Sequence, residues 1–138
     1  MKLFFTVPGE PRGKGHPRFT RSGHAYTDRE TKAYEEKIVA YYRMSLRGAR
    51  VPDEAFVSVD AVAYLPIPKD ATKAQIAGMA AKTILPSRKP DVDNILKAVL
   101  DALNGVAYKD DSRVYRTSCV KFYSAEPRLE IFIKEVGD

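Results

Sequence analysis

Four stretches of the chain alternate between apolar and polar residues, which is the pattern of a β-strand with one face in a core. The first stretch is residues 2–7 and the second is residues 56–65. The last two, residues 113–123 and 127–136, are separated only by Ser124-Ala-Glu. A connection this short predicts that the last two strands pair with each other as a hairpin.

A further stretch carries apolar residues at helical spacing. It begins at a capping-box sequence in which Thr27 caps the helix and Glu30 reaches back. The pattern predicts a helix that runs to about Leu46 and stops near Gly48. Its expected buried face consists of Tyr34, Ile38, Tyr41 and Tyr42.

A second helix is predicted over residues 91–104. Pro90 precedes it, Asp91 occupies the expected N-cap position, and Gly105 follows where glycine is favoured. Its apolar stripe consists of Ile95, Ala98, Val99, Ala102 and Leu103. An alanine-rich stretch at residues 71–82 predicts one more short helix.

The predicted elements follow the order β-α-β-(α)-α-β-β. This order indicates an α/β (α+β) fold in which a mixed β-sheet packs with helices as a sandwich. The length of 138 residues suits a single domain, so we expect one domain over residues 1–138. Hydrophobic residues make up 44% of the chain, which is enough for a core without disulfides.

The single cysteine and the N-terminus indicate a cytoplasmic protein. Cys119 has no partner for an intrachain disulfide or a CxxC metal site, and we expect a small buried thiol. The apolar run at the N-terminus is too short for a signal peptide, because Pro8 and Gly9 end it. We therefore expect a reducing cytoplasm, no membrane partner and no small-molecule cofactor.

Basic residues are concentrated in the first third of the chain. The formal net charge is +5, and residues 11–50 carry ten Lys or Arg against four acids, giving +6. Between the first strand and the first helix, three prolines and four glycines predict a long basic loop without regular structure. A basic segment of this kind suits binding of a polyanion such as DNA.

The basic loop has two interpretations. In one, its cations, His16 among them, contact phosphates while Phe19 or Tyr26 stacks on bases. In the other, it is a solvated loop with no partner. The predicted DNA-binding residues are Arg12, Lys14, Arg18 and Arg21 from the loop, with Lys89 and Asn94 from further along the chain. Neither His16 nor His24 is expected to bind metal, because no acid accompanies them.

Acidic residues cluster at the start of the second helix and just after it. Asp91 and Asp93 stand two residues apart, and Asp110 and Asp111 follow the helix. Carboxylates without His or Cys suit a hard cation such as Mg²⁺ or Mn²⁺. Such an ion activates water and polarises a phosphoryl oxygen in phosphodiester hydrolysis. Lys97, one turn after Asp93, could stabilise the developing charge on the phosphate.

Each of these residues also has a purely structural interpretation. Asp91 could be only an N-cap, and Asp93 could only complement the helix dipole. Asp93, Lys97 and Asp101 stand at i, i+4 and i+8 and could form a solvated ladder of ion pairs. The acids at 110–111 could belong to a polar turn. Spacing alone leaves these alternatives open.

The combination of motifs closely resembles the signature of RusA-type Holliday-junction resolvases. The resemblance lies in the run Lys89-Pro-Asp-Val-Asp-Asn-Ile-Leu-Lys, the Asp-Ala-Leu at 101–103 and the Asp-Asp pair at 110–111. The segment from Val7 to Thr27 is similar to the basic N-terminal segment of phage-type members, so the resemblance covers nearly the whole chain. The stretch 66–86 has no counterpart in the family's shorter members, and no role is transferred to it.

The resemblance implies specific roles for the motif residues. Asp91, Asp93 and Asp111 would be the metal-binding catalytic carboxylates, and Lys97 the catalytic lysine. Asn94 would lie close to the site. The remaining motif acids, Asp101 and Asp110, are expected to have supporting structural roles, with Asp101 positioning Lys97.

The resemblance also implies a substrate and an assembly. The expected protein is a Mg²⁺-dependent endonuclease that resolves four-way DNA junctions by paired symmetric nicks during recombination and repair. Because a four-way junction has approximate twofold symmetry, we expect a homodimer with one active site for each nick. Two alternatives remain from the residues alone: a nuclease for other branched DNA, and a catalytically silent DNA-binding module.

Overall fold

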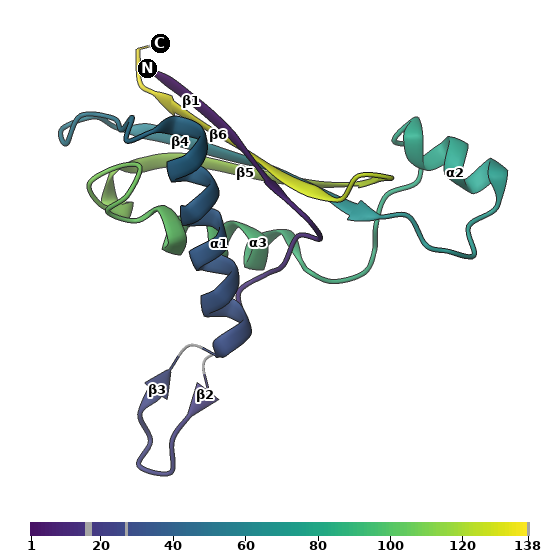
Figure 1. The fold of residues 1–138 in the computed structure, drawn as a ribbon, viewed down its shortest axis with the longest axis horizontal. Coiled ribbons are helices and arrows are strands. Elements are labelled where there is room, and N and C mark those ends of the chain that lie inside the picture. Colours follow the sequence, from purple (N-terminus) through teal and green to yellow (C-terminus); the bar gives the residue numbers. More distant parts are fainter. Residues whose placement is uncertain (16–17, 27, 138) are drawn as a thin grey trace.

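A computed structural model describes residues 1–15, 18–26 and 28–137 (Figure 1). The elements, in chain order, are β1 (Lys2–Pro8), β2 (Arg18–Phe19), β3 (Ala25–Tyr26), α1 (Arg29–Leu46), β4 (Val57–Pro66), α2 (Lys73–Ala80), α3 (Val92–Leu103), the 3₁₀ turn η1 (Asp111–Arg113), β5 (Val114–Ser124) and β6 (Arg128–Glu135). The predicted α+β class, the mixed sheet and the order of the long elements are confirmed.

The order of strands in the sheet corrects one prediction. The sheet has the order β1-β6-β4-β5, so β4 lies between the two strands that we expected to form a hairpin. β4 runs parallel to β5 and antiparallel to β6. Its inward positions from Val57 to Leu65 are all buried, as suits a strand with neighbours on both edges. The predicted β5–β6 hairpin is therefore wrong, because a short connection does not require its two strands to be neighbours.

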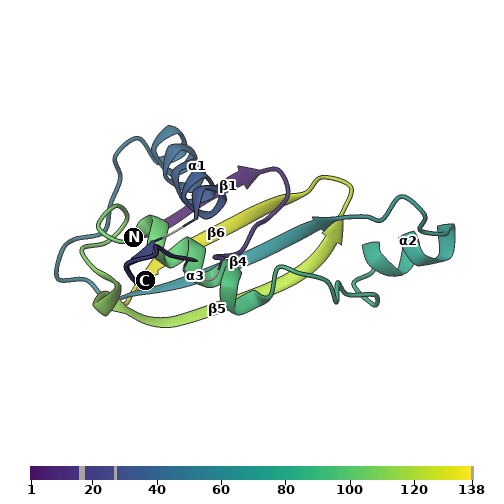
Figure 2. The same ribbon diagram turned by 90° about the horizontal axis from the view of Figure 1, so that it is seen from below.

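The helices α1 and α3 pack against the same face of the sheet (Figure 2). α1 contacts β1, α3 contacts β4 and β5, and the two helices contact each other. All five residues of the predicted α3 stripe are buried. On α1, Tyr34, Ile38 and Tyr42 are buried as predicted, whereas Tyr41 is half-buried and Thr31 is buried in addition.

The opposite face of the sheet carries exposed apolar side chains. Phe4 and Phe132 pair across β1 and β6 with ring centroids 4.7 Å apart, and they are 48% and 40% exposed. Val120 on β5 is also exposed. Toward one end, the Arg128 guanidinium lies 3.9 Å from the centre of the Tyr64 ring. Neither α1 nor α3 covers this face.

Asp28 caps the N-terminus of α1. Its Oδ1 accepts a hydrogen bond from the Thr31 backbone N–H (2.8 Å), and its Oδ2 accepts one from the Thr31 hydroxyl (2.9 Å). The prediction that the helix is capped one residue earlier is wrong; Thr27 itself lies outside the described residues. Aspartate competes well for this position because its carboxylate also favours the positive end of the helix dipole.

Two segments differ in detail from the predictions. The basic loop contains a two-stranded hairpin, β2 with β3, that projects beyond the N-terminal end of α1 (Figure 1). Its turn depends on Gly23, which has a φ of +86°, a value that glycine adopts readily.

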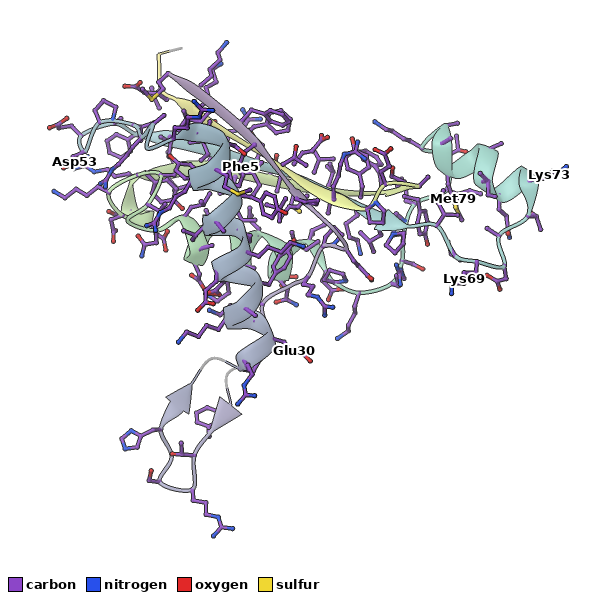
Figure 3. All side chains as sticks on the ribbon, viewed as in Figure 1. Phe5, Glu30, Asp53, Lys69, Lys73 and Met79 are labelled. Atoms are coloured by element: carbon purple, nitrogen blue, oxygen red, sulfur yellow. The ribbon has the colours of Figure 1, made fainter. Side chains whose placement is uncertain are left out.

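The predicted third helix is present as α2, which lies away from α1 and α3 (Figure 3). Lys73 lies at its start, and Met79 is buried near its end.

Cys119 is half-buried on β5, and burial raises the pKa of its thiol to about 11. The thiol that the sequence predicted to be buried is therefore only partly so. Over the ranges 1–15, 18–26 and 28–137, no helix is long and apolar enough to cross a membrane.

The capping of α1 can be tested by mutation. Asp28→Ala should lower the free energy of unfolding by about 1 kcal/mol, because the first turn loses its side-chain acceptor. Urea denaturation followed by circular dichroism measures this loss. A larger loss for Thr27→Ala than for Asp28→Ala would contradict the assignment of the cap.

Candidate active site

The first turn of α3 presents two exposed carboxylates. Asp91 has the extended backbone of an N-cap, with φ −76° and ψ 152°, yet its side chain makes no capping hydrogen bond. Asp93 follows in the first turn, and both residues are exposed. The interpretation of Asp91 as only a helix cap is therefore not supported, since its carboxylate is not used by the helix.

Residues far apart in the sequence meet Asp91 around one cavity of about 420 Å³. The cavity lies between the start of the basic loop, the N-terminal end of α1 and the start of α3. Four predicted DNA-binding residues line it together with the candidate catalytic acid: Arg12, Lys14, Lys89 and Asn94. The fold thus places cationic and amide side chains beside a carboxylate that is open to solvent.

Close backbone contacts hold the start of the basic loop against both helices. A Cβ on Gly13 would lie 2.9 Å from the Cβ of Asn94, so only glycine permits this approach to α3. The Lys14 N–H donates to the Asn94 carbonyl (2.8 Å), and the Gly15 N–H donates to the Thr31 hydroxyl (3.0 Å). Residues 13–15 therefore form a fixed segment rather than a free loop.

The Lys14 ammonium lies between two carboxylates. Its Nζ is 3.0 Å from Glu35 Oε2 on α1 and 2.8 Å from Asp101 Oδ2 on α3, and the side chain is only 16% exposed. Burial lowers the pKa of Lys14, but the hydrogen bonds and charges of Asp101 and Glu35 outweigh burial and leave it raised. This arrangement favours a structural role over the phosphate contact predicted for Lys14.

A second group of polar residues lies at the C-terminal end of α3. Lys97 is 62% exposed, and its Nζ is 4.0 Å from Asp101 Oδ2. Asp111 receives a long hydrogen bond from the buried Tyr108 hydroxyl (3.4 Å), and its own N–H donates to Asn104 Oδ1 (3.1 Å). Burial, followed by the negative charge of Asp101, raises the pKa of Asp111. Asp111 thus belongs to the surroundings of Asp101 and Lys97.

Asp110 has the structural role expected of it. Its carboxylate accepts a hydrogen bond from the Ser112 N–H (2.9 Å) and caps the short turn η1. This hydrogen bond lowers the pKa of Asp110.

One predicted set of ligands is not assembled within a single chain. Asp93 and Asp101 are eight residues apart on α3, which corresponds to about 12 Å of helix rise. Asp91 and Asp93 lie at the first turn of the helix, whereas Asp111 follows the helix and interacts with Asp101 and Lys97. In the part of the chain that the structure describes, no three acidic, histidine or cysteine residues form a group that could hold a metal.

The predicted contacts from the outer part of the basic loop are only partly described. Arg21 and Phe19 are exposed on the β2–β3 hairpin, Phe19 by 67%. Of the Arg18 and Tyr26 side chains nothing is described, and His16 lies outside the described residues.

Sequence reasoning missed two residues that organise the site. Glu35 completes the ion pair of Lys14, and Tyr108 is fully buried beneath Asp111. The sequence held one signal for the first, since a lysine between two glycines can approach a helix closely. It held no signal for the second, because Tyr108 lies outside any periodic stretch.

Comparisons with known proteins identify the family of the chain. The family model of endodeoxyribonuclease RusA matches residues 8–134. A relative from Bacillus subtilis (strain 168), the uncharacterized protein YqaN, is 40% identical over 137 residues, and the match covers 96% of each chain. Both matches include the acids of α3 and the basic loop. The chain therefore belongs to the RusA family of endodeoxyribonucleases.

Proposed function

We propose that the protein is a Mg²⁺-dependent endonuclease that cuts four-way DNA junctions. The observation that carries this proposal is that the exposed Asp91 lines one cavity with Arg12, Lys89 and Asn94, with a second exposed acid, Asp93, in the first turn of the same helix. A phosphodiester needs cationic groups to bind it and acids to hold the metal that makes its phosphorus reactive. Here both kinds of group meet at one helix start.

The chemistry of the donors suits magnesium. Mg²⁺ usually binds through one or two carboxylates, with the remaining positions filled by waters and substrate phosphate oxygens. Asp91 and Asp93 would be those two carboxylates, and Mn²⁺ fits the same oxygen ligands. When bound, the ion supplies an activated water and polarises the scissile phosphate.

The other residues of the site bind and orient the DNA. Arg12 and Lys89 hold the phosphates on either side of the cut, and the Asn94 amide hydrogen-bonds the backbone near Asp91. Lys97 extends from the next turn of α3 and stabilises the negative charge that develops on the phosphate. The exposed Arg21 extends the basic surface along an arm of the junction.

A homodimer matches the symmetry of the substrate. Two nicks in strands of like polarity need two active sites related by a twofold axis. Within the described residues of one chain, Asp91, Asp93 and Asp111 form no group that could hold a metal, so a second copy could supply the further ligand. We expect such an enzyme to act in recombination and repair in the cytoplasm.

The exposed face of the sheet is the surface that a second copy would cover. Phe4, Phe132 and Val120 form an apolar centre there, and exposed apolar groups of this kind mark association surfaces. Around this centre the face carries Asp60 and Glu130 as well as Lys134, so acids and bases are available for pairing across a twofold axis.

The active site can be tested on a labelled synthetic four-way junction. Asp93→Asn should abolish Mg²⁺-dependent cleavage, because the substitution removes a ligand charge while it preserves size. Junction binding in a gel-shift assay should persist. Asp53→Asn is the matched control, since Asp53 is an exposed acid that pairs with Arg50 away from the site. Normal cutting by Asp93→Asn would show that the site is misassigned.

The same assay shows which DNA structure the protein prefers to cut. Paired symmetric nicks on the junction, with little cutting of a flap or a linear duplex, are expected. Equal cutting of flaps would favour a nuclease for other branched DNA. Binding without cutting in every divalent metal tried would favour a silent DNA-binding module.

The dimer can be tested through the exposed sheet face. Phe132→Glu should convert a dimer into a monomer, because it buries a charge in the apolar centre of the interface. Sedimentation equilibrium measures the change. Leu85→Glu is the control, since Leu85 is a comparably exposed apolar residue near α2. A wild-type protein that sediments as a monomer, or an equal effect of both variants, would contradict this interface.

A further inference from the structure

Two lysines approach the same carboxylate oxygen. Asp101 Oδ2 lies 2.8 Å from the Nζ of Lys14 and 4.0 Å from the Nζ of Lys97. Lys14 comes from the start of the basic loop, whereas Lys97 stands one turn before Asp101 on α3. The nearer lysine is not the one that the family signature couples to Asp101.

The backbone holds Lys14 in this position. Gly13 packs against Asn94 and Pro90, and Gly15 approaches Asp28 and Thr31 so closely that a Cβ there would collide with the Asp28 carboxylate. Glu35 binds the same ammonium from α1 at 3.0 Å. Lys14 therefore has little freedom to leave Asp101, and its ammonium is largely withdrawn from solvent.

Lys97 is the more exposed of the two lysines near Asp101. It is 62% exposed and stands four residues before Asp101, a spacing at which a lysine and an aspartate pair readily on a helix. Asp111 also faces this region, and its charge interacts with both Asp101 and Lys97. If Asp101 had no other partner, the Lys97 ammonium would be drawn back along α3 toward these acids and away from the first turn.

We propose that Lys14 is a positioning residue that occupies Asp101 and so leaves the Lys97 ammonium available to the substrate phosphate. This inference rests on the proposed function, in which Lys97 acts at the scissile phosphate. Asp101 then positions Lys97 indirectly, by pairing with Lys14 instead of with Lys97. The start of the basic loop and the catalytic helix are coupled through this one carboxylate.

The test is a double-mutant cycle with Lys14→Met, Asp101→Asn and the combined variant. Lys14→Met should lower kcat on the four-way junction by about twofold to fivefold, the factor by which an exposed ion pair would withhold Lys97. The combined variant should regain most of this loss, because Asp101→Asn removes the carboxylate that captures Lys97. A Lys14 that served only to hold the loop would predict no recovery, and that result would overturn the proposal.

A second readout does not depend on cleavage. The rate at which an acetylating reagent modifies the Lys97 amine, read by peptide mass spectrometry, should fall about twofold to fivefold in Lys14→Met. It should recover in the combined variant. Lys73, exposed at the start of α2, is the internal reference. An unchanged rate in folded Lys14→Met would overturn the proposal.

Two controls keep the interpretation specific. Lys121→Met removes another half-buried lysine beside α3, one that donates to the Arg88 and Pro90 carbonyls and not to Asp101. It should leave the acetylation of Lys97 unchanged. If Lys14→Met fails to fold, Lys14→Gln, which keeps a hydrogen-bond donor without the charge, takes its place with the same expected results.

Failure of the proposed endonuclease function and failure of the proposed role of Lys14 would give different results. If the wild-type protein cuts no junction in any metal, the proposed function fails, while the acetylation rates still report whether Lys14 controls Lys97. If the wild-type protein cuts and neither kcat nor acetylation responds to Lys14→Met, only the role of Lys14 fails.

Discussion

The burial of one face of α3 is the constraint on which the candidate site depends. Five apolar side chains, from Ile95 to Leu103, are buried between the sheet and α1. Burial on this scale, at about 1.5–3 kcal/mol for each large side chain, fixes the rotation of the helix about its axis. The polar residues of the same helix are then obliged to face outward. Asp91 and Asp93 emerge at its start, and Lys97 and Asp101 emerge further along.

The charged residues of the site are of two kinds: exposed acids, and a lysine that is paired with acids and withdrawn from solvent. The acids at the start of α3 are left exposed, where they are available to a cation. Lys14, by contrast, is withdrawn from solvent, and a half-buried ammonium is stable only with acids beside it. Asp101 and Glu35 supply those acids and, in doing so, join the basic loop to both helices. Lys14 therefore stabilises the packing of the basic loop on the helices, whereas Arg12 and Lys89 line the cavity.

The elements could be predicted from the sequence where a local pattern determines them. The amphipathic stripes of α1 and α3 and the alternation of β1 and β4 are local, and their predictions hold. The neighbours of a strand are not a local property: alternation in residues 113–136 shows that both strands have a buried face, but not that β4 lies between them. The N-cap of α1 is Asp28, one residue after the predicted Thr27, because aspartate and threonine are both favoured at this position.

The site was predictable in its residue types and only partly in its geometry. A motif identifies Asp91, Asp93, Asp101 and Lys97 because they share one helix. It does not show which charges meet across the fold: the glycines on either side of Lys14 indicate a close approach, but not that Glu35 and Asp101 are its partners. The sequence shows that Asp91 precedes the helix and Asp111 follows it, but not that the acids form no single metal-binding group within the described residues of one chain.

This arrangement of the acids has a consequence for how cleavage would be controlled. A chain that carried all its metal ligands in one place could cut any duplex that it met. In the proposed enzyme the exposed pair, Asp91 and Asp93, would need substrate phosphates and further ligands to complete the shell of a magnesium ion. The proposed enzyme would then be most active where two copies and a branched substrate come together. On that proposal, selectivity for a junction would follow from incomplete sites, without a side chain that reads the branch point by itself.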